Sequence, residues 1–391
     1  MPGGGGFQTT SNIPGSTTTP GVSAAREIGL TVGELEPGPH DAITDVDGVL
    51  VGHATISRGE GALRVGEGPV RTGVTVVVPH AGIWREPVFA AIHRLNGNGE
   101  LTGSHWIAEA GTLPTPIGLT NTHSVGVVRD ALAAAHCRAR AGEEFWSLPV
   151  VGETWDGILN DIDGQHVRAE HVEEALEFAA GGPVAQGCVG GGTGMICHEF
   201  KGGIGSASRR VGEADGGYTV GALVQANHGR RERLVINGVR VGRAIGAAEV
   251  PLPVPPEGAA AGAGSIIVVL ATDAPLLPHQ CERLAQRATI GIARTGEVGA
   301  HYSGDIFIAF ATGNRGLEPD AVDSTAPREA AVTMLADPHI TALFDAAAEA
   351  TEAAIVNALL AATTTTGRDG ITAHALPADR LLKVLGSAAE G

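Results

Sequence analysis

The sequence predicts a layered α+β fold. Runs of β-branched and aliphatic residues bounded by Gly or Pro indicate strands, and other segments carry the apolar spacing of amphipathic helices. The two kinds of segment do not alternate strictly along the chain, which favours an α+β fold over a doubly wound parallel sheet. The length of 391 residues allows one large domain or two or three ordinary ones.

In the first half of the chain, the expected elements are strands at residues 43–51 and 73–79 and helices at residues 129–140 and 169–180. A turn at Asp45–Gly48 is expected within the first strand segment. Residues 89–126 are crowded with Gly, Asn, Thr, His and Pro. Because ordinary connections are short, this stretch either serves the function or contains elements that the pattern hides.

In the second half, the expected elements are strands at residues 218–226, 233–241, 266–271 and 306–311, helices at residues 277–293 and 346–361, and a short last helix after Pro377. Asn237–Gly238 is a hairpin signal inside the second of these strands. Residues 251–264 contain four prolines followed mostly by small residues, so they are expected to form an exposed loop.

Charge and cysteine content exclude several classes of function. The formal net charge is −17, which makes nucleic acid and anionic membranes poor partners. The four cysteines show no zinc-like spacing and are expected to be reduced thiols of a cytoplasmic protein. Residues 1–25 lack the basic and apolar regions of a secretory signal and are expected to form a mobile or disordered tail.

The junction between Gly264 and Ser265 suggests a reaction. A run of alanine and glycine meets a strand there at a single hydroxyl group. If the bond between the two residues broke, Ser265 would carry both a nucleophilic hydroxyl and a free α-amine. An α-amine has a pKa of roughly 7.7–8.0 and can act as a general base near neutral pH. An ordinary strand start is the alternative interpretation.

The sequence resembles the L-aminopeptidase/D-esterase family, which includes the β-peptidyl aminopeptidases. The resemblance runs from about Gly29 over nearly the whole chain and rests on the segments GSIIVVLATDAPLLPHQCERLAQRATIGIARTG, AITDVDGVLVGH, LNGNGELTGSHWIAEAG, PIGLTNTHSVGVVRDAL, PVVGETWDGILND, GCVGGGTGMICHEFKGGIGSASR, GALVQANHG and SGDIFIAFATGN. It implies a four-layer αββα sandwich that cleaves itself into two chains. The implied large subunit is residues 26–264, ending in the processing loop 251–264, and the implied small subunit is residues 265–391.

The resemblance also implies catalytic roles. Ser265 corresponds to the nucleophile and new N-terminus, and Ser303, in YSGD, to a serine beside the nucleophile and its amine. Asp305 stands where β-peptide-cleaving members are expected to carry glutamate. Its shorter carboxylate is expected to orient Ser303 or to hold the amine. Asn227, in QANHG, matches the residue whose amide donates to the oxyanion of the tetrahedral intermediate.

Glu153 and Trp155, in GETWDG, are the candidates for substrate binding. Glu153 would pair with the ammonium group of a free N-terminus, and Trp155 would line the pocket. Taken without the resemblance, Ser303 is a turn residue, Asp305 caps backbone amides and Asn227 is a left-handed residue at a strand end. Glu153 and Trp155 are then a surface charge and a core aromatic.

No metal or organic cofactor is expected. The segment GCVGGGTG lacks the Gly-Lys-Ser/Thr ending of a phosphate-binding loop. The histidines, including His105, His123, His198 and His228, form no HExxH or HxxxH pair. Each is expected to be hydrogen-bonded or at the surface.

These observations predict a self-processing serine aminopeptidase or amidase that releases an N-terminal L-, D- or β-amino acid from small peptides, amides or esters. Two alternatives stay open. One is an acyltransferase on the same fold, similar to ornithine acetyltransferase, in which a threonine normally begins the second chain. The other is a non-catalytic, uncleaved binding protein. The resemblance further implies a homo-oligomer, a tetramer of processed pairs.

Overall fold

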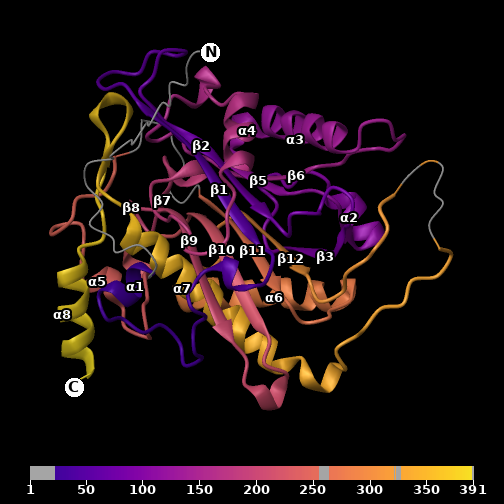
Figure 1. Ribbon diagram of the computed structural model, residues 1–391. Coiled ribbons are helices and arrows are strands. Elements are labelled where there is room, and N and C mark those ends of the chain that lie inside the picture. Colours follow the sequence, from indigo (N-terminus) through magenta and orange to yellow (C-terminus); the bar gives the residue numbers. More distant parts are fainter. Residues whose placement is uncertain (1–22, 255–263, 321, 323–326, 390–391) are drawn as a thin grey trace, which may run out of the picture.

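Figure 1 shows the protein as a computed structural model, which describes residues 23–254, 264–320, 322 and 327–389. Residues 1–22 of the expected tail and residues 255–263 of the expected processing loop lie outside the described part. Ala24 and Ala25, which were expected to end the mobile tail, instead belong to helix α1 (Ala24–Glu27), and Ala25 is buried against the core. The fold mixes helices with several sheets, so the α+β prediction is confirmed.

The smaller of the two main sheets has the strand order β1-β2-β5-β6. Its strands are β1 (Leu50–Arg58), β2 (Val70–Val78), β5 (Ile117–Asn121) and β6 (Val150–Thr154). Neighbouring strands are antiparallel except β5 and β6, which are parallel. Helices α3 (Val125–Ala139) and α4 (Ala169–Glu177) pack against this sheet and lie above it in Figure 1.

The larger sheet has the strand order β4-β3-β12-β11-β10-β9. Its strands are β3 (Val88–Arg94), β4 (Thr112–Leu113), β9 (Gly203–Arg210), β10 (Thr219–Asn227), β11 (Ser265–Thr272) and β12 (Gly304–Ala311). Only β11 and β12 run parallel to each other among these pairs. Helices α6 (Pro278–Arg294) and α7 (Thr341–Ala361) pack against it and lie below it in Figure 1.

Strand β11 is buried on both faces, which explains its uninterrupted β-branched sequence. Ile266 and Val268 belong to the core between the larger sheet and helices α6 and α7. Ile267 and Val269 belong to the core that also contains β1, β2 and β5 residues. Because side chains alternate along a strand, Ser265 shares the face of Ile267, toward the smaller sheet.

The remaining described elements are small. They are α2 (Ser104–Ala110), α5 (Val241–Ala244), α8 (Ala378–Ala389), β7 (Ile196–Cys197), β8 (Phe200–Lys201), β13 (Thr365–Thr366) and β14 (Thr372–Ala373). Within the described ranges, no helix combines the length and apolarity needed to cross a membrane.

The strand expected at residues 43–51 is largely wrong. Ile43–Asp45 forms a 3-10 turn, and β1 begins only at Leu50. The cause is the Asp45 side chain, whose carboxylate accepts hydrogen bonds from the backbone N–H groups of His40 and Ala42 at 3.0 and 3.1 Å. These bonds stabilise a turn in place of an extended backbone.

Residues 233–241 were also expected to form a strand, and there only the turn is confirmed. Asn237 and Gly238 both have positive φ angles, 49° and 78°. A single bridge joins Ile236 to Val239 around this turn. Residues 89–126, in contrast, contain the hidden elements that their length suggested, since β3, α2, β4 and β5 all fall within or overlap them.

Candidate active site

Ser265 begins β11 at the edge of the space between the two main sheets. Its Oγ accepts a hydrogen bond of 3.0 Å from the backbone N–H of Gly304. The residue is 6% exposed, so most of its surface is buried. The β-ladders place Ser265 opposite Asn227 on one side and opposite Gly304 on the other.

Gly264 packs closely against the end of the neighbouring strand β10. A Cβ atom at this position would lie 2.4 Å from Asn227 O and 3.0 Å from the Cα of His228. No side chain fits there, which explains why glycine precedes Ser265. Gly264 therefore lies directly against the backbone of Asn227 and His228.

The Asn227 side chain is oriented by two hydrogen bonds. Its Oδ1 accepts from the Ile196 backbone N–H at 2.8 Å, and its Nδ2 donates to Trp155 O at 2.9 Å. An amide nitrogen carries two hydrogens, so one remains after the bond to Trp155. Asn227 follows the same alternation as Leu223, whose side chain packs in the core between the sheets, and therefore shares the face of Ser265.

Ser303 and Asp305 form a second polar pair at the start of β12. Ser303 Oγ donates to Asp305 Oδ1 at 2.6 Å, and Asn96 Nδ2 donates to Asp305 Oδ2 at 3.1 Å. Burial raises the pKa of Asp305 to about 6, against the opposing effect of the Ser303 bond. Among the described residues, no hydrogen bond joins this pair to Ser265, which pairs with the intervening Gly304.

A cavity of about 410 Å³ opens beside Ser265. Its lining includes the expected binding residues Glu153 and Trp155, together with Asn98, Gly99, Glu100, Thr122, Gly264 and Tyr302. Glu153 is 3% exposed and accepts hydrogen bonds from the Thr122 hydroxyl and from the Glu100 N–H at 3.0 Å. Burial raises the pKa of Glu153 above its ordinary value. A buried carboxylate of this kind is stabilised by a cationic ligand.

The backbone that carries Trp155 is fixed by a buried polar network around Asp156. Asn160 Nδ2 donates to Asp156 Oδ1 at 3.0 Å, and Asn121 Nδ2 donates to Thr72 Oγ1 at 2.7 Å. Burial raises the pKa of Asp156 to about 7. Asp156 Oδ2 and Asn121 Oδ1 are buried and without a partner in the described part of the chain.

Sequence reasoning named seven site residues and missed four polar groups that the structure places with them. Asn96 bonds Asp305, Thr122 and Glu100 bond Glu153, and Asn98 Nδ2 donates to Tyr302 O at 2.7 Å beside the cavity. All four lie in segments that carried the family resemblance, LNGNGELTGSHWIAEAG and PIGLTNTHSVGVVRDAL. Their partners come from other strands, so sequence position alone does not reveal these roles.

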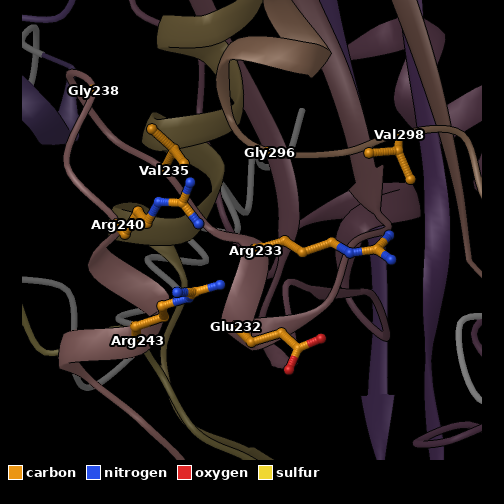
Figure 2. Close-up of a pocket in the computed structure, with 8 residues that line it drawn as sticks. All are labelled: Glu232, Arg233, Val235, Gly238, Arg240, Arg243, Gly296 and Val298. Atoms are coloured by element: carbon orange, nitrogen blue, oxygen red, sulfur yellow. The ribbon is translucent and has the colours of Figure 1, made fainter.

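Two further features lie outside this constellation. One is a cavity of about 450 Å³, whose lining is drawn in Figure 2. It includes Arg233, Arg240 and Arg243 and none of the expected site residues. The other feature is a group of possible metal ligands. Cys197, His198 and His228 bring one donor atom each within 4.8 Å of one another, although their spacing in sequence did not suggest a metal site.

Comparisons with known proteins agree with this geometry. The profile of peptidase family S58 matches residues 41–373. The chain is 47% identical over 369 residues to the beta-peptidyl aminopeptidase BapA of Sphingosinicella microcystinivorans, covering 92% of this chain and 91% of that protein. It is 42% identical over 374 residues to BapA of Sphingosinicella xenopeptidilytica, covering 92% and 90%.

Solved structures give the same result. A beta-aminopeptidase of Burkholderia sp. superposes with a TM-score of 0.86 at 53% identity, covering 93% of this chain and 98% of that one. The L-aminopeptidase D-Ala-esterase/amidase of Ochrobactrum anthropi, described as a variant of the Ntn hydrolase fold, gives 0.83 at 43% identity, covering 93% and 98%. These matches favour a hydrolase over the acyltransferase and the non-catalytic binding protein. The chain therefore belongs to peptidase family S58 and is an aminopeptidase of the N-terminal-nucleophile type.

Proposed function

We propose that the protein cleaves itself between Gly264 and Ser265 and then uses Ser265 to release N-terminal residues from small peptides, amides or esters. One observation carries the proposal. Ser265 pairs with Asn227 across the ladder of β10 and β11, and it lines a cavity that also contains the buried carboxylate of Glu153. We assign to these three residues the roles of nucleophile, oxyanion donor and anchor for a substrate ammonium group, and their proximity supports the assignment.

Self-cleavage would begin with attack of Ser265 Oγ on the Gly264 carbonyl carbon. The C–N bond breaks as the C–O bond forms, the hydroxyl proton passes to the released nitrogen, and an ester remains. Water then hydrolyses the ester, leaving a carboxylate on Gly264 and a free amine and hydroxyl on Ser265. The close packing of Gly264 against the backbone of Asn227 supports this step, because it holds the peptide bond before Ser265 in a fixed position.

In the mature enzyme the same hydroxyl would attack the carbonyl carbon of the substrate's N-terminal residue. The α-amine of Ser265 accepts the hydroxyl proton and delivers it to the leaving group. Asn227 Nδ2 donates to the oxyanion. Ser303, bonded to Asp305, would hold the α-amine in position, and water would finally release the acyl group. No step requires a metal or an organic cofactor.

Substrate selection would follow from the cavity. Glu153 pairs with the free ammonium group, and Trp155 packs against the first side chain. We propose a small N-terminal β-amino acid as the preferred residue, because two relatives and one solved structure are named as β-aminopeptidases. Asp305 stands where a glutamate is expected in that branch, so its role in orienting Ser303 is a further point to test.

We also propose a four-layer αββα sandwich divided into a large subunit, residues 26–264, and a small one, residues 265–391. The packing of α3 and α4 on one sheet and of α6 and α7 on the other supports the layers. A tetramer of processed pairs is proposed from the family resemblance. The four free cysteines support a cytoplasmic location.

Intact-mass spectrometry of the wild type, Ser265→Ala and the exposed control Ser57→Ala tests the proposal. We expect two masses that divide at Ser265 in the wild type and in the control, and one full-length mass in Ser265→Ala. The cleaved proteins should hydrolyse p-nitroanilides of β-alanine, and Ser265→Ala should not. Cleavage or hydrolysis by Ser265→Ala would refute the role of this hydroxyl.

A further inference from the structure

Cys197, His198 and His228 form a compact group of metal-binding donors behind the active site. Cys197 ends β7, His198 follows it, and His228 follows β10. All three are buried, and one donor atom from each lies within 4.8 Å of the others. Cys197 Sγ and His228 Nδ1 are 4.0 Å apart. A thiol and two imidazoles are a ligand set that zinc prefers.

The hydrogen bonding of His198 prepares it as a ligand. Its Nδ1 lies 3.1 Å from Arg230 O. A carbonyl oxygen only accepts, so Nδ1 carries the proton and Nε2 keeps a free lone pair. Metal-binding histidines are commonly fixed in this way by a carbonyl on the second ring nitrogen.

Both rings also have an unused nitrogen. Nε2 of His198 and Nε2 of His228 are buried and have no hydrogen-bond partner in the described ranges. An unpartnered buried polar atom costs about 1–3 kcal/mol. A bound ion would satisfy the free nitrogen of His198. On His228 the nitrogen that lies 4.0 Å from Cys197 Sγ is Nδ1, so Nδ1 would be the ligand and Nε2 would carry the proton.

The backbone at His198 is strained and firmly held. His198 and Glu199 are the central residues of the turn between β7 and β8, and both have positive φ angles, 48° and 59°. Such turns favour Asn and Gly, so two larger residues are unusual. Arg231 supports the turn by donating to His198 O at 3.2 Å and to Glu199 O at 2.6 Å. The turn therefore fixes the backbone of His198 next to Cys197.

We propose that Cys197, His198 and His228 bind one zinc ion and that its binding inhibits the enzyme. Ideal tetrahedral zinc places sulfur and nitrogen ligands about 3.3–3.6 Å apart, so shifts of about 1 Å would complete the site. The Cys197 thiol gives up its proton to water as the Zn–S bond forms. The buried carboxylate of Glu297 acts electrostatically on both Cys197 and His198 and would offset the remaining positive charge.

Inhibition follows from the neighbours of the ligands and rests on the proposed role of Asn227. Ile196, which orients Asn227 Oδ1, directly precedes Cys197, and Asn227 directly precedes His228. A second bond, from His198 N–H to His228 O at 2.6 Å, ties the two segments together. Drawing the ligands onto an ion therefore moves both ends of the hydrogen bond that orients the oxyanion donor.

Cobalt(II), a spectroscopic substitute for zinc, tests the site in the full-length protein. We expect a thiolate-to-cobalt charge-transfer band and tetrahedral d–d bands that Cys197→Ser abolishes. A variant with the other three cysteines replaced by serine (Cys137, Cys188 and Cys281) should keep them, and this variant decides the case even if Cys197→Ser does not fold. Absence of the bands in the wild type, or their loss in the three-cysteine variant, would overturn the site.

Zinc inhibition is measured separately. We expect kcat/KM of the wild type to fall about tenfold on saturation with zinc, within the usual range of coupling between two sites, and to recover with a chelator. His198→Gln should lose this response, measured against its own zinc-free rate. Cobalt bands without inhibition would refute the link to Asn227. Because the bands do not depend on turnover, the site is decided even if the proposed aminopeptidase activity is absent.

Discussion

Replacing Asn227 by alanine should remove the oxyanion donor while the other residues of the site stay in place. Removing one such donor from a hydrolase costs about 2.7–4 kcal/mol of transition-state stabilisation, which lowers kcat by about 10²–10³. The KM should change little, because the donor acts on the oxyanion and not on the substrate's ammonium group. The rate is measured with the p-nitroanilide of a small β-amino acid and is divided by the amount of cleaved protein, since self-cleavage would use the same donor.

The structure also predicts a loss of stability, which needs a control. Asn227→Ala leaves Ile196 N–H and Trp155 O without partners, at about 1–3 kcal/mol each. Gln225 provides a matched case two residues earlier on the same face. Its Nε2 donates to Thr120 O and to Thr154 Oγ1 at 2.8 and 2.9 Å.

Gln225→Ala should therefore destabilise the fold to a similar extent, by urea unfolding, while keeping most of kcat. Equal losses of kcat in Gln225→Ala and Asn227→Ala would refute the oxyanion role and assign the effect of Asn227 to packing.

Three other predictions concern buried carboxyl groups. Glu153→Gln should raise the KM of substrates with a free amine about 10- to 100-fold, because a hydrogen bond to a charged group contributes about 1.5–3 kcal/mol; the inhibition constant of an N-acetylated analogue should not change, and an equal rise in both would contradict the role of the charge. Since the pKa of Asp305 is about 6 and its ionised form is the one that orients Ser303, kcat/KM should fall as the pH drops through about 6, and this limb should disappear in Asp305→Asn and persist in Asp305→Glu. Burial raises the pKa of Asp156 from 3.8 to about 7, so its contribution to stability is complete below about pH 4 and is lost as the pH rises through about 7, about 4 kcal/mol in all. Asp156→Asn should flatten this dependence in urea unfolding between about pH 5 and pH 8, and an unchanged slope would count against it.

The sequence predicted a segment correctly where its own residues determine the backbone conformation. The prediction was wrong where contacts with other parts of the chain determine that conformation. Residues 266–271 were identified as a strand because β11 is buried on both faces, so its composition reports its environment. Residues 43–51 misled because one carboxylate, that of Asp45, stabilises a turn inside an apolar run. The turn at Asn237–Gly238 was identified from its sequence, whereas the flanking residues lack a partner strand beyond one bridge.

The same distinction applies to the site. Ser265 and its preceding glycine could be identified locally, since both the chemistry and the steric need lie in adjacent residues. The contact of Ser265 with Asn227 depends on the register between β10 and β11, and Asn96 reaches Asp305 across 209 residues. The sequence did not predict the group of Cys197, His198 and His228. The turn after β7 and the end of β10 bring these residues together in the fold.

The order of strands in the larger sheet affects how this enzyme would fold and unfold before and after cleavage. Strands β11 and β12, which would belong to the small subunit, lie between β3 and β10 of the large one. Cleavage would therefore leave two chains interlocked in one sheet, and neither could leave without breaking ladders on both sides. The uncut chain should refold after dilution from denaturant, whereas the cut pair would have to find each other again. The lifetime of the folded cut pair would then be set by its rate of unfolding. The peptide bond after residue 264 would help the chain to fold only before it is cleaved.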